Sequence, residues 1–461
     1  MNQPRQALLA LSATLLLAAA PAHAAPGDAA AAKALLMQGV AFDTVKGRGK
    51  VPAYAAFLKE TLVKGGFAAA DISIEPVGET ANLHLVWKGR GKAAPIAITA
   101  HMDVVEADPK DWQRDPFTAI EEGGYIFGRG SEDNKFDLSM LVASMISLKA
   151  QGFRPGRDIH VFFSGDEETD GLTAPLQAKQ AKAAGVALML NTDGGGGTLN
   201  EAGTPIGYRM SAAEKTYVDL KLSVTDPGGH SSRPTGSNAI ARLANAAARI
   251  GGYRFKPQLD EITRASLAAE GAKRNDAIGK AMLAFVANPA DAAAIAVLRA
   301  DPASVGQIGT TCEPTMINGG HAPNALPQSA TLIVNCRIFP GVTVETVRDE
   351  LARIVNDPSV VFSFDLGWPS PPASPLRPDV MAAVAKAVSA SRPGVTPVPS
   401  MSAGASDSVF YRALGIPSYA VGGIFSRDAD KFSHGLNERI PVSAIAPALV
   451  HWRTLITELA K

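Results

Sequence analysis

Seven imidazole and carboxylate side chains are the residues in this chain best suited to chemistry: His101, Asp103, Asp133, Glu167, Glu168, Asp193 and His434. All lie in polar or Gly-rich segments, and most follow a short apolar run directly. Imidazole and carboxylate ligands without thiolate suit zinc, manganese or cobalt. Two neighbouring ions need one carboxylate that touches both. The set therefore predicts a site for one or two divalent cations.

Taken alone, each of these residues could be an ordinary loop residue with no role in metal binding. An isolated His-x-Asp or an acidic pair usually belongs to a polar loop. The acidic run Asp166–Glu168, however, carries charge repulsion that only cations would relieve. Gly404–Ser408 lacks the final glycine of a nucleophile elbow, which disfavours a serine hydrolase. Gly194–Gly197 lacks the Gly-Lys-Ser/Thr ending of a phosphate loop.

The elements that must position this set alternate between strands and helices. Apolar runs at Ala94–Ala100, Ile159–Phe163 and Val186–Leu190 end in the polar clusters. Helical stretches lie between them, at Asp137–Gln151 and Thr173–Ala184. This order predicts an α/β fold with a doubly wound, mostly parallel sheet, in which ligands bind beyond the carboxyl ends of the strands.

A second, smaller α+β unit interrupts the first. Lys215–Thr225 alternates apolar and polar residues as a half-buried strand does. The further expected elements are helices at Asn238–Ile250 and Val344–Val355, strands at Thr311–Ile317, Ala330–Ile338 and Val360–Phe364, and a loop at Asn318–Gln328. We expect a catalytic domain in two parts, 25–213 and 367–461, around a lid or dimerisation domain at 214–366 with a helical insertion at about 253–307.

Residues 1–24 have the features of a signal peptide. Arg5 precedes an apolar run, Ala7–Ala20, that is too short to span a bilayer, and Ala22-His23-Ala24 is a cleavage signal. We expect cleavage after Ala24, a periplasmic or secreted protein, and no membrane attachment after cleavage; an uncleaved anchor is the alternative.

Composition excludes several classes of function. The 44 basic and 44 acidic residues give no positive excess, which argues against a nucleic-acid partner. With only two cysteines, neither a disulfide scaffold nor a Cys-rich zinc module is possible. Export would permit a Cys312–Cys336 disulfide, and two buried free thiols are an equal alternative.

The chain resembles the M20 family of metallopeptidases and aminoacylases over nearly its whole mature length. Six ordered motifs carry the resemblance: His101–Val105, Gly128–Lys135, Ser164–Glu168, Asn191–Asp193, Gly228–Pro234 and His434–Glu438. Pro314–Gly320 and Asn324–Pro327 are most similar to the branch of carboxypeptidases and N-acyl-amino-acid hydrolases.

The resemblance implies a two-zinc centre, with cobalt or manganese as possible replacements. His101 and Asp193 would hold one ion. Glu168 and His434 would hold the other. Asp133 would bridge the two and precede a cis peptide bond.

The resemblance also implies the catalytic groups. Asp103 would accept a hydrogen bond from His101 and so orient its ring. Glu167 would act as general base, taking a proton from water and passing it to the leaving amine. His230 would reach across a homodimer to stabilise the oxyanion.

Substrate contacts are the remaining implication. Arg337 would bind a terminal carboxylate as a bidentate fork, with a structural salt bridge as its alternative. Asn324 and Gly404 are weaker candidates, and Asn238 has the alternative role of a helix cap.

The resulting hypothesis is an exported di-zinc hydrolase that cleaves C-terminal amide bonds of peptides or N-acyl amino acids. A dipeptidase, or a non-catalytic metal- or peptide-binding protein on the same scaffold, is the alternative.

Overall fold

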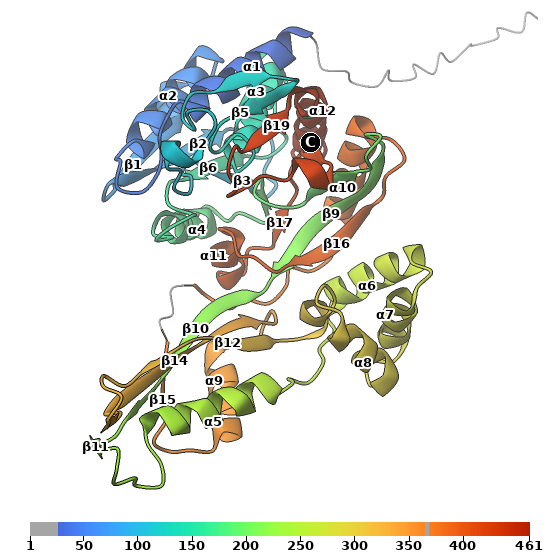
Figure 1. The fold of residues 1–461 in the computed structure, drawn as a ribbon. Helices are drawn as coiled ribbons and strands as arrows, with labels where there is room; N and C mark the ends of the chain where they lie inside the picture. Colours follow the sequence, from blue (N-terminus) through green and yellow to red (C-terminus); the bar gives the residue numbers. More distant parts are fainter. Residues whose placement is uncertain (1–25, 365–367) are drawn as a thin grey trace, which may run out of the picture.

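The structure is a computed structural model that describes residues 26–364 and 368–461. The predicted signal peptide therefore lies outside the described residues. Figure 1 shows a large α/β body, a second sheet below it, and a group of three helices beside that sheet. Within the described ranges, none of the helices has both the length and the apolar character needed to cross a bilayer.

The centre of the large sheet is parallel, which confirms the predicted fold class. Strands β6 (Ile159–Ser164), β3 (Ile96–His101), β7 (Met189–Asn191) and β17 (Ser418–Ala420) run side by side in this order. Every residue of β3 and β6 is buried, as expected of strands covered on both faces.

Shorter or more exposed strands complete this sheet on both sides of the parallel centre. The added strands are β1 (Ile72–Val77) and β2 (Thr80–Trp87) beyond β6, and β9 (Pro205–Glu214), β8 (Gly196–Leu199), β16 (Pro397–Ser402) and β18 (Phe425–Ser426) beyond β17. β1 and β2 pair antiparallel with their neighbours, β8 is antiparallel to β9 but parallel to β18, and β16 is parallel to β9.

Helices cover both faces of the sheet. Successive residues of a strand point to opposite faces, so each face contributes to a separate hydrophobic core. Ile98 and Val161 face a core built with α1 (Pro26–Val40), α2 (Val51–Lys64), α3 (Lys135–Ala150), α10 (Pro378–Ser391) and α12 (Ile445–Leu459). Ala97 and Phe162 face a smaller core built with α4 (Thr173–Ala183) and α11 (Ser408–Ala413). The sheet is thus doubly wound.

The second sheet is antiparallel, with the order β12 (Thr311–Gly319), β14 (Ser329–Ile338), β10 (Thr216–Thr225) and β15 (Val361–Ser363). Helices α5 (Ala239–Gly252) and α9 (Val344–Val355) share its core. Cys312 and Cys336 lie opposite each other on β12 and β14 and form a disulfide. Of the two alternatives for the cysteines, the structure shows the disulfide and not the free thiols.

Three helices between α5 and β12 form a small bundle with a core of its own: α6 (Glu261–Lys273), α7 (Ala277–Ala287) and α8 (Ala292–Ala300). Helix α6 packs against β16 of the large sheet.

Two small ladders were not predicted. One joins β4 (Ile120–Glu122), β5 (Tyr125–Phe127) and β19 (Arg439–Pro441). The other joins β11 (Gly229–His230) to β13 (Ala325–Leu326). The expectation of a plain loop over residues 318–328 was therefore wrong at residues 325–326, and also at residues 318–319, where β12 continues.

Candidate metal centre

The carboxyl ends of three adjacent strands bring most of the seven side chains together. His101 ends β3, Glu167 and Glu168 follow β6, and Asp193 follows β7. Because these strands are parallel neighbours, their ends meet at one edge of the sheet. Asp133 comes from the segment before α3, and its peptide bond to Asn134 is cis.

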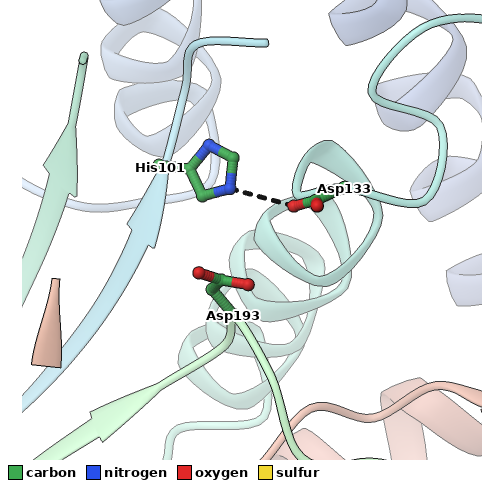
Figure 2. A group of neighbouring side chains, drawn as sticks. All are labelled: His101, Asp133 and Asp193. Carbon is green, nitrogen blue, oxygen red and sulfur yellow. Dashed lines mark hydrogen bonds and ion pairs between the residues drawn. The ribbon is translucent and has the colours of Figure 1, made fainter. Parts of the chain in front are cut away.

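Ligand atoms of these residues form three triads, in each of which the three atoms lie within 4.8 Å of one another, and two of the triads share Asp133. The first contains His101, Asp133 and Asp193, and Figure 2 shows the imidazole and both carboxylates drawn together. The second contains Asp133, Glu168 and His434. Asp133 is common to both, which is the arrangement that a bridging ligand requires.

The two carboxylate oxygens of Asp133 face different histidines. Oδ1 lies 3.0 Å from Nε2 of His101 (Figure 2), and Oδ2 lies 3.3 Å from Nε2 of His434. His434 also hydrogen-bonds Oε1 of Glu168 at 2.8 Å. Each half of Asp133 therefore points into a different triad.

Asp103 is close to His101, but its carboxylate does not make the predicted hydrogen bond. Nδ1 of His101 lies 3.0 Å from the main-chain oxygen of Asp103 and 3.6 Å from Oδ1; the second distance is too long for a hydrogen bond. The carboxylate instead accepts the main-chain N–H groups of Glu167 and Glu168, at 3.1 and 3.0 Å. Asp103 thus holds the turn that carries both glutamates, and its backbone orients the imidazole.

Burial and mutual repulsion shape the charges of this cluster. Burial, together with the charge of Asp193, raises the pKa of Glu167 well above its usual range. Burial and Asp133 do the same for the pKa of Asp193. Hydrogen bonds to Asp133 and Glu168 raise the pKa of His434 to about 10. Bound protons or divalent cations would each relieve the repulsion among these carboxylates.

A buried carboxylate that was not assigned a role from the sequence anchors the Asp133 segment. Glu438 is fully buried and pairs with Arg129 at 2.6 Å. Its Oε1 accepts the main-chain N–H groups of Glu132 and Asp133, at 2.8 and 3.0 Å. The sequence could have pointed to this residue, since Glu438 ends the motif that begins with His434. This carboxylate therefore ties the Asp133 segment to the segment that supplies His434.

A second buried network supports the Asp193 side. Asn191 Oδ1 accepts the N–H of Asp193 at 2.9 Å, and its amide donates to Ser406 and Ser408, both at 3.0 Å. Ser406 in turn donates to Glu214 at 2.5 Å. Both hydroxyls thus hold the amide of Asn191, which in turn fixes the main chain of Asp193.

Arg337 and Gly404 lie beside each other at the edge of this region. Nη1 of Arg337 donates to the main-chain oxygen of Ala403 at 2.8 Å, and its guanidinium covers the ring of Tyr217 at 4.7 Å. Two neighbours of Gly404, Ser402 and Ala405, line a cavity of about 80 Å³ together with Asp193. Arg337 therefore contacts a loop that borders the metal centre, and it forms no salt bridge within the described part of the chain.

The remaining predicted residues lie elsewhere. His230 and Asn324 come together on the β11–β13 ladder, where the N–H of Ser231 donates to the oxygen of Asn324 at 3.0 Å. Figure 1 places β11 at the end of the second sheet that is remote from β3. Asn238 caps α5 by accepting the N–H of Ala241 at 3.0 Å. This is the capping role given above as the alternative to a substrate contact.

Comparisons with known proteins identify a family, related sequences and a shared fold. Residues 97–458 match the model of peptidase family M20/M25/M40. The chain is 30% identical to an N-fatty-acyl-amino acid synthase/hydrolase, PM20D1.1, of Danio rerio over 390 residues, covering 82% of this chain and 74% of that protein. It is 31% identical to a probable carboxypeptidase S-like 2 of Dictyostelium discoideum over 299 residues, covering 61% of this chain and 56% of that protein.

Among solved structures, an M20 family metallo-carboxypeptidase of Sulfolobus solfataricus, Sso-CP2, has the same fold. The TM-score is 0.69 at 18% identity, with 92% of this chain and 98% of that chain covered.

Proposed function

Since the chain belongs to peptidase family M20/M25/M40, we propose that it is an exported di-zinc hydrolase that cleaves C-terminal amide bonds of peptides or N-acyl amino acids. One observation carries the proposal: two ligand triads that share Asp133. The substrate class follows the names of the relatives, a hydrolase of N-fatty-acyl amino acids and a probable carboxypeptidase.

Five side chains would hold the metal pair. His101 and Asp193 are the terminal ligands of one ion, and Glu168 and His434 those of the other. The donor set of nitrogen and carboxylate oxygen fits zinc, and cobalt or manganese could replace it. A third triad joins His101, Glu167 and Glu168. We assign Glu167 to catalysis, since the two triads that share Asp133 already give each ion one histidine and two carboxylates.

Two bound cations would acidify water and polarise a substrate carbonyl. Glu167 is the proposed general base, which takes a proton from that water and delivers it to the leaving amine. Its main chain is fixed by Asp103, whereas its carboxylate makes no hydrogen bond within the described residues. The carboxylate is thus held at the cluster but left free to exchange a proton.

Arg337 would recognise the free carboxylate that both substrate classes share. Its fork suits a carboxylate, and its contact with Ala403 keeps it at the border of the metal centre. Gly404 is the accompanying substrate contact in the same subunit. Asn324, which lies beside the β11–β13 ladder, would contact the substrate bound in a partner subunit.

His230 would complete the active site of a partner subunit. His230 belongs to β11, and the position of β11 in Figure 1, remote from β3, fits a residue that acts across a homodimer and stabilises the oxyanion there.

An activity screen tests this function. Zinc-loaded protein is offered N-acyl amino acids, blocked peptides and dipeptides, each as the free acid and as the matched amide. We expect hydrolysis of the free acids and little of the amides, with a raised KM when Arg337 is changed to Gln. Equal cleavage of acids and amides contradicts the role of Arg337. No cleavage by protein that carries two metal ions supports a binding protein instead.

Export has its own measurement. Mass spectrometry of the secreted or periplasmic protein should give a mature chain that begins at Ala25, and a chain that begins at Met1 would refute cleavage.

A further inference from the structure

A second pocket, of about 480 Å³, lies on the other side of Arg337, between the second sheet and the segments that flank the α6–α8 bundle. Four basic side chains line it: Lys215, Arg254, Arg299 and Arg337. One acid, Glu313, lines it as well. The pocket is therefore positively charged, in a protein whose sequence carries no net charge.

Within the described residues, these four cations have no carboxylate partner. Across residues 26–364 and 368–461, no salt bridge within 4.0 Å involves any of them. Each donates to main-chain carbonyls instead: Lys215 to Gly309, Arg254 to Tyr253, Arg299 to Phe255 and Arg337 to Ala403. Neutral acceptors leave the charge of the group uncompensated, so the pocket suits an anionic ligand.

Lys215 is the most informative member because it is only 2% exposed. Its Nζ lies 2.8 Å from the oxygen of Gly309 and 3.5 Å from Oγ1 of Thr311. Burial, with the nearby charge of Arg337, lowers its pKa to about 8. An ammonium group has three donors, and a buried one without a counter-ion is stabilised by any carboxylate that reaches it.

The pocket and the small cavity beside Asp193 are lined by neighbouring residues of the same two segments. Glu214, the residue before Lys215, bonds Ser406, and both line the small cavity beside Asp193. Ala403, from the same loop as Ser406, lines the large pocket and accepts the hydrogen bond from Arg337. A substrate whose α-carboxylate meets Arg337 would thus project its side chain away from the metals and toward Lys215.

We propose that this pocket receives the side chain of the leaving amino acid and selects a second carboxylate, so that substrates ending in an acidic residue are preferred. Aromatic rings of Tyr253 and Phe255 at the pocket wall would contact the methylene groups of that side chain. The inference rests on the proposed function, because it assigns the specificity of the same site.

The test compares four substrates with one acyl group and different leaving residues: glutamate, glutamine, leucine and lysine. We expect kcat/KM for glutamate to exceed that for glutamine by about tenfold or more, the effect of a hydrogen bond between charged groups. Lys215→Met should bring this ratio close to one. Arg299→Gln should lower it as well, and gives an independent variant at a less buried position.

The matched control is Arg264→Gln, which removes a cation of α6 that bonds the oxygen of Val286 and does not line the pocket. It should leave the glutamate-to-glutamine ratio unchanged. Equal kcat/KM for glutamate, glutamine and leucine would overturn the inference but leave the hydrolase intact. If no substrate is cleaved, the proposed function fails. Calorimetry then tests the pocket separately. The protein should bind free glutamate more tightly than glutamine, and equal or absent binding of the two overturns the inference.

Discussion

The carboxylate of Glu438 accepts the main-chain N–H of Asp133 at 3.0 Å, although the two residues are 305 positions apart. This bond joins the segment of Asp133, the proposed bridging ligand, to the segment of His434. Metal ligands from distant parts of a chain stay in register only when such supports hold them.

Glu438→Gln should therefore weaken metal binding without removing a ligand. An amide keeps the shape of the side chain but loses the charge that pairs with Arg129 and favours the hydrogen bonds to the Asp133 segment. We expect zinc affinity to fall by about 10–100-fold, measured by competition with a chromogenic chelator. Glu345→Gln, at an exposed position of α9, is the control. Unchanged affinity in the folded Glu438 variant would contradict this role.

Glu167→Gln separates catalysis from metal binding. The variant should keep its metal content, because the five proposed ligands remain, and should lose roughly 10²–10⁴-fold in kcat, the range for a general base. Metal analysis and initial rates on the same preparation check both halves. A variant that retains wild-type turnover removes Glu167 from the role of base.

Asp137 should make stability depend on pH. It is buried, accepts a hydrogen bond from Trp452 at 2.7 Å, and burial raises its pKa from 3.8 to about 7. Between these values the folded protein keeps a proton that the unfolded chain releases. Stability contributed by the protonated acid is thus complete below about pH 4 and is lost as pH rises to 7.

The side chain in Asp137→Asn cannot ionise, so the variant should not lose this stability as the pH rises. The free energy of unfolding of the variant minus that of the wild type should therefore increase by roughly 4 kcal/mol between pH 4 and pH 8. Urea unfolding with chelator present measures the difference. Asp111→Asn, an exposed change, should show no such trend. A constant difference between the Asp137 variant and the wild type at all pH values would refute the argument.

The sequence was sufficient to predict features that depend on local pattern. The helix Val344–Val355 has the predicted bounds, and β3 and β7 end in the predicted polar clusters. These follow from periodicity and from the rule that parallel strands present their carboxyl ends together.

Features that depend on distant partners could not be predicted from the sequence. The Asp103 carboxylate binds two amides that lie 64 and 65 residues away, so its role is visible only in the folded chain. The pairing of β11 with β13 joins segments of two residues each, too short for any pattern. The four cations of the second pocket likewise come from separate segments that only the fold brings together.

The disulfide should stabilise the second sheet. Cys312 and Cys336 close a loop with a sequence separation of 24, so replacing both with Ala should lower the free energy of unfolding by about 3 kcal/mol. Chemical denaturation with and without reductant measures it. Reductant should destabilise the wild type and leave the double variant unaffected; if it affects both equally or neither, the disulfide has no such role.

The central claim is that five side chains hold two cations around Asp133. Anomalous scattering at the zinc edge, from a crystal of zinc-loaded protein, locates the ions directly. We predict two peaks about 3.5–4 Å apart, one beside His101 and Asp193, the other beside Glu168 and His434. A single peak, or a pair that does not flank Asp133, would contradict the account.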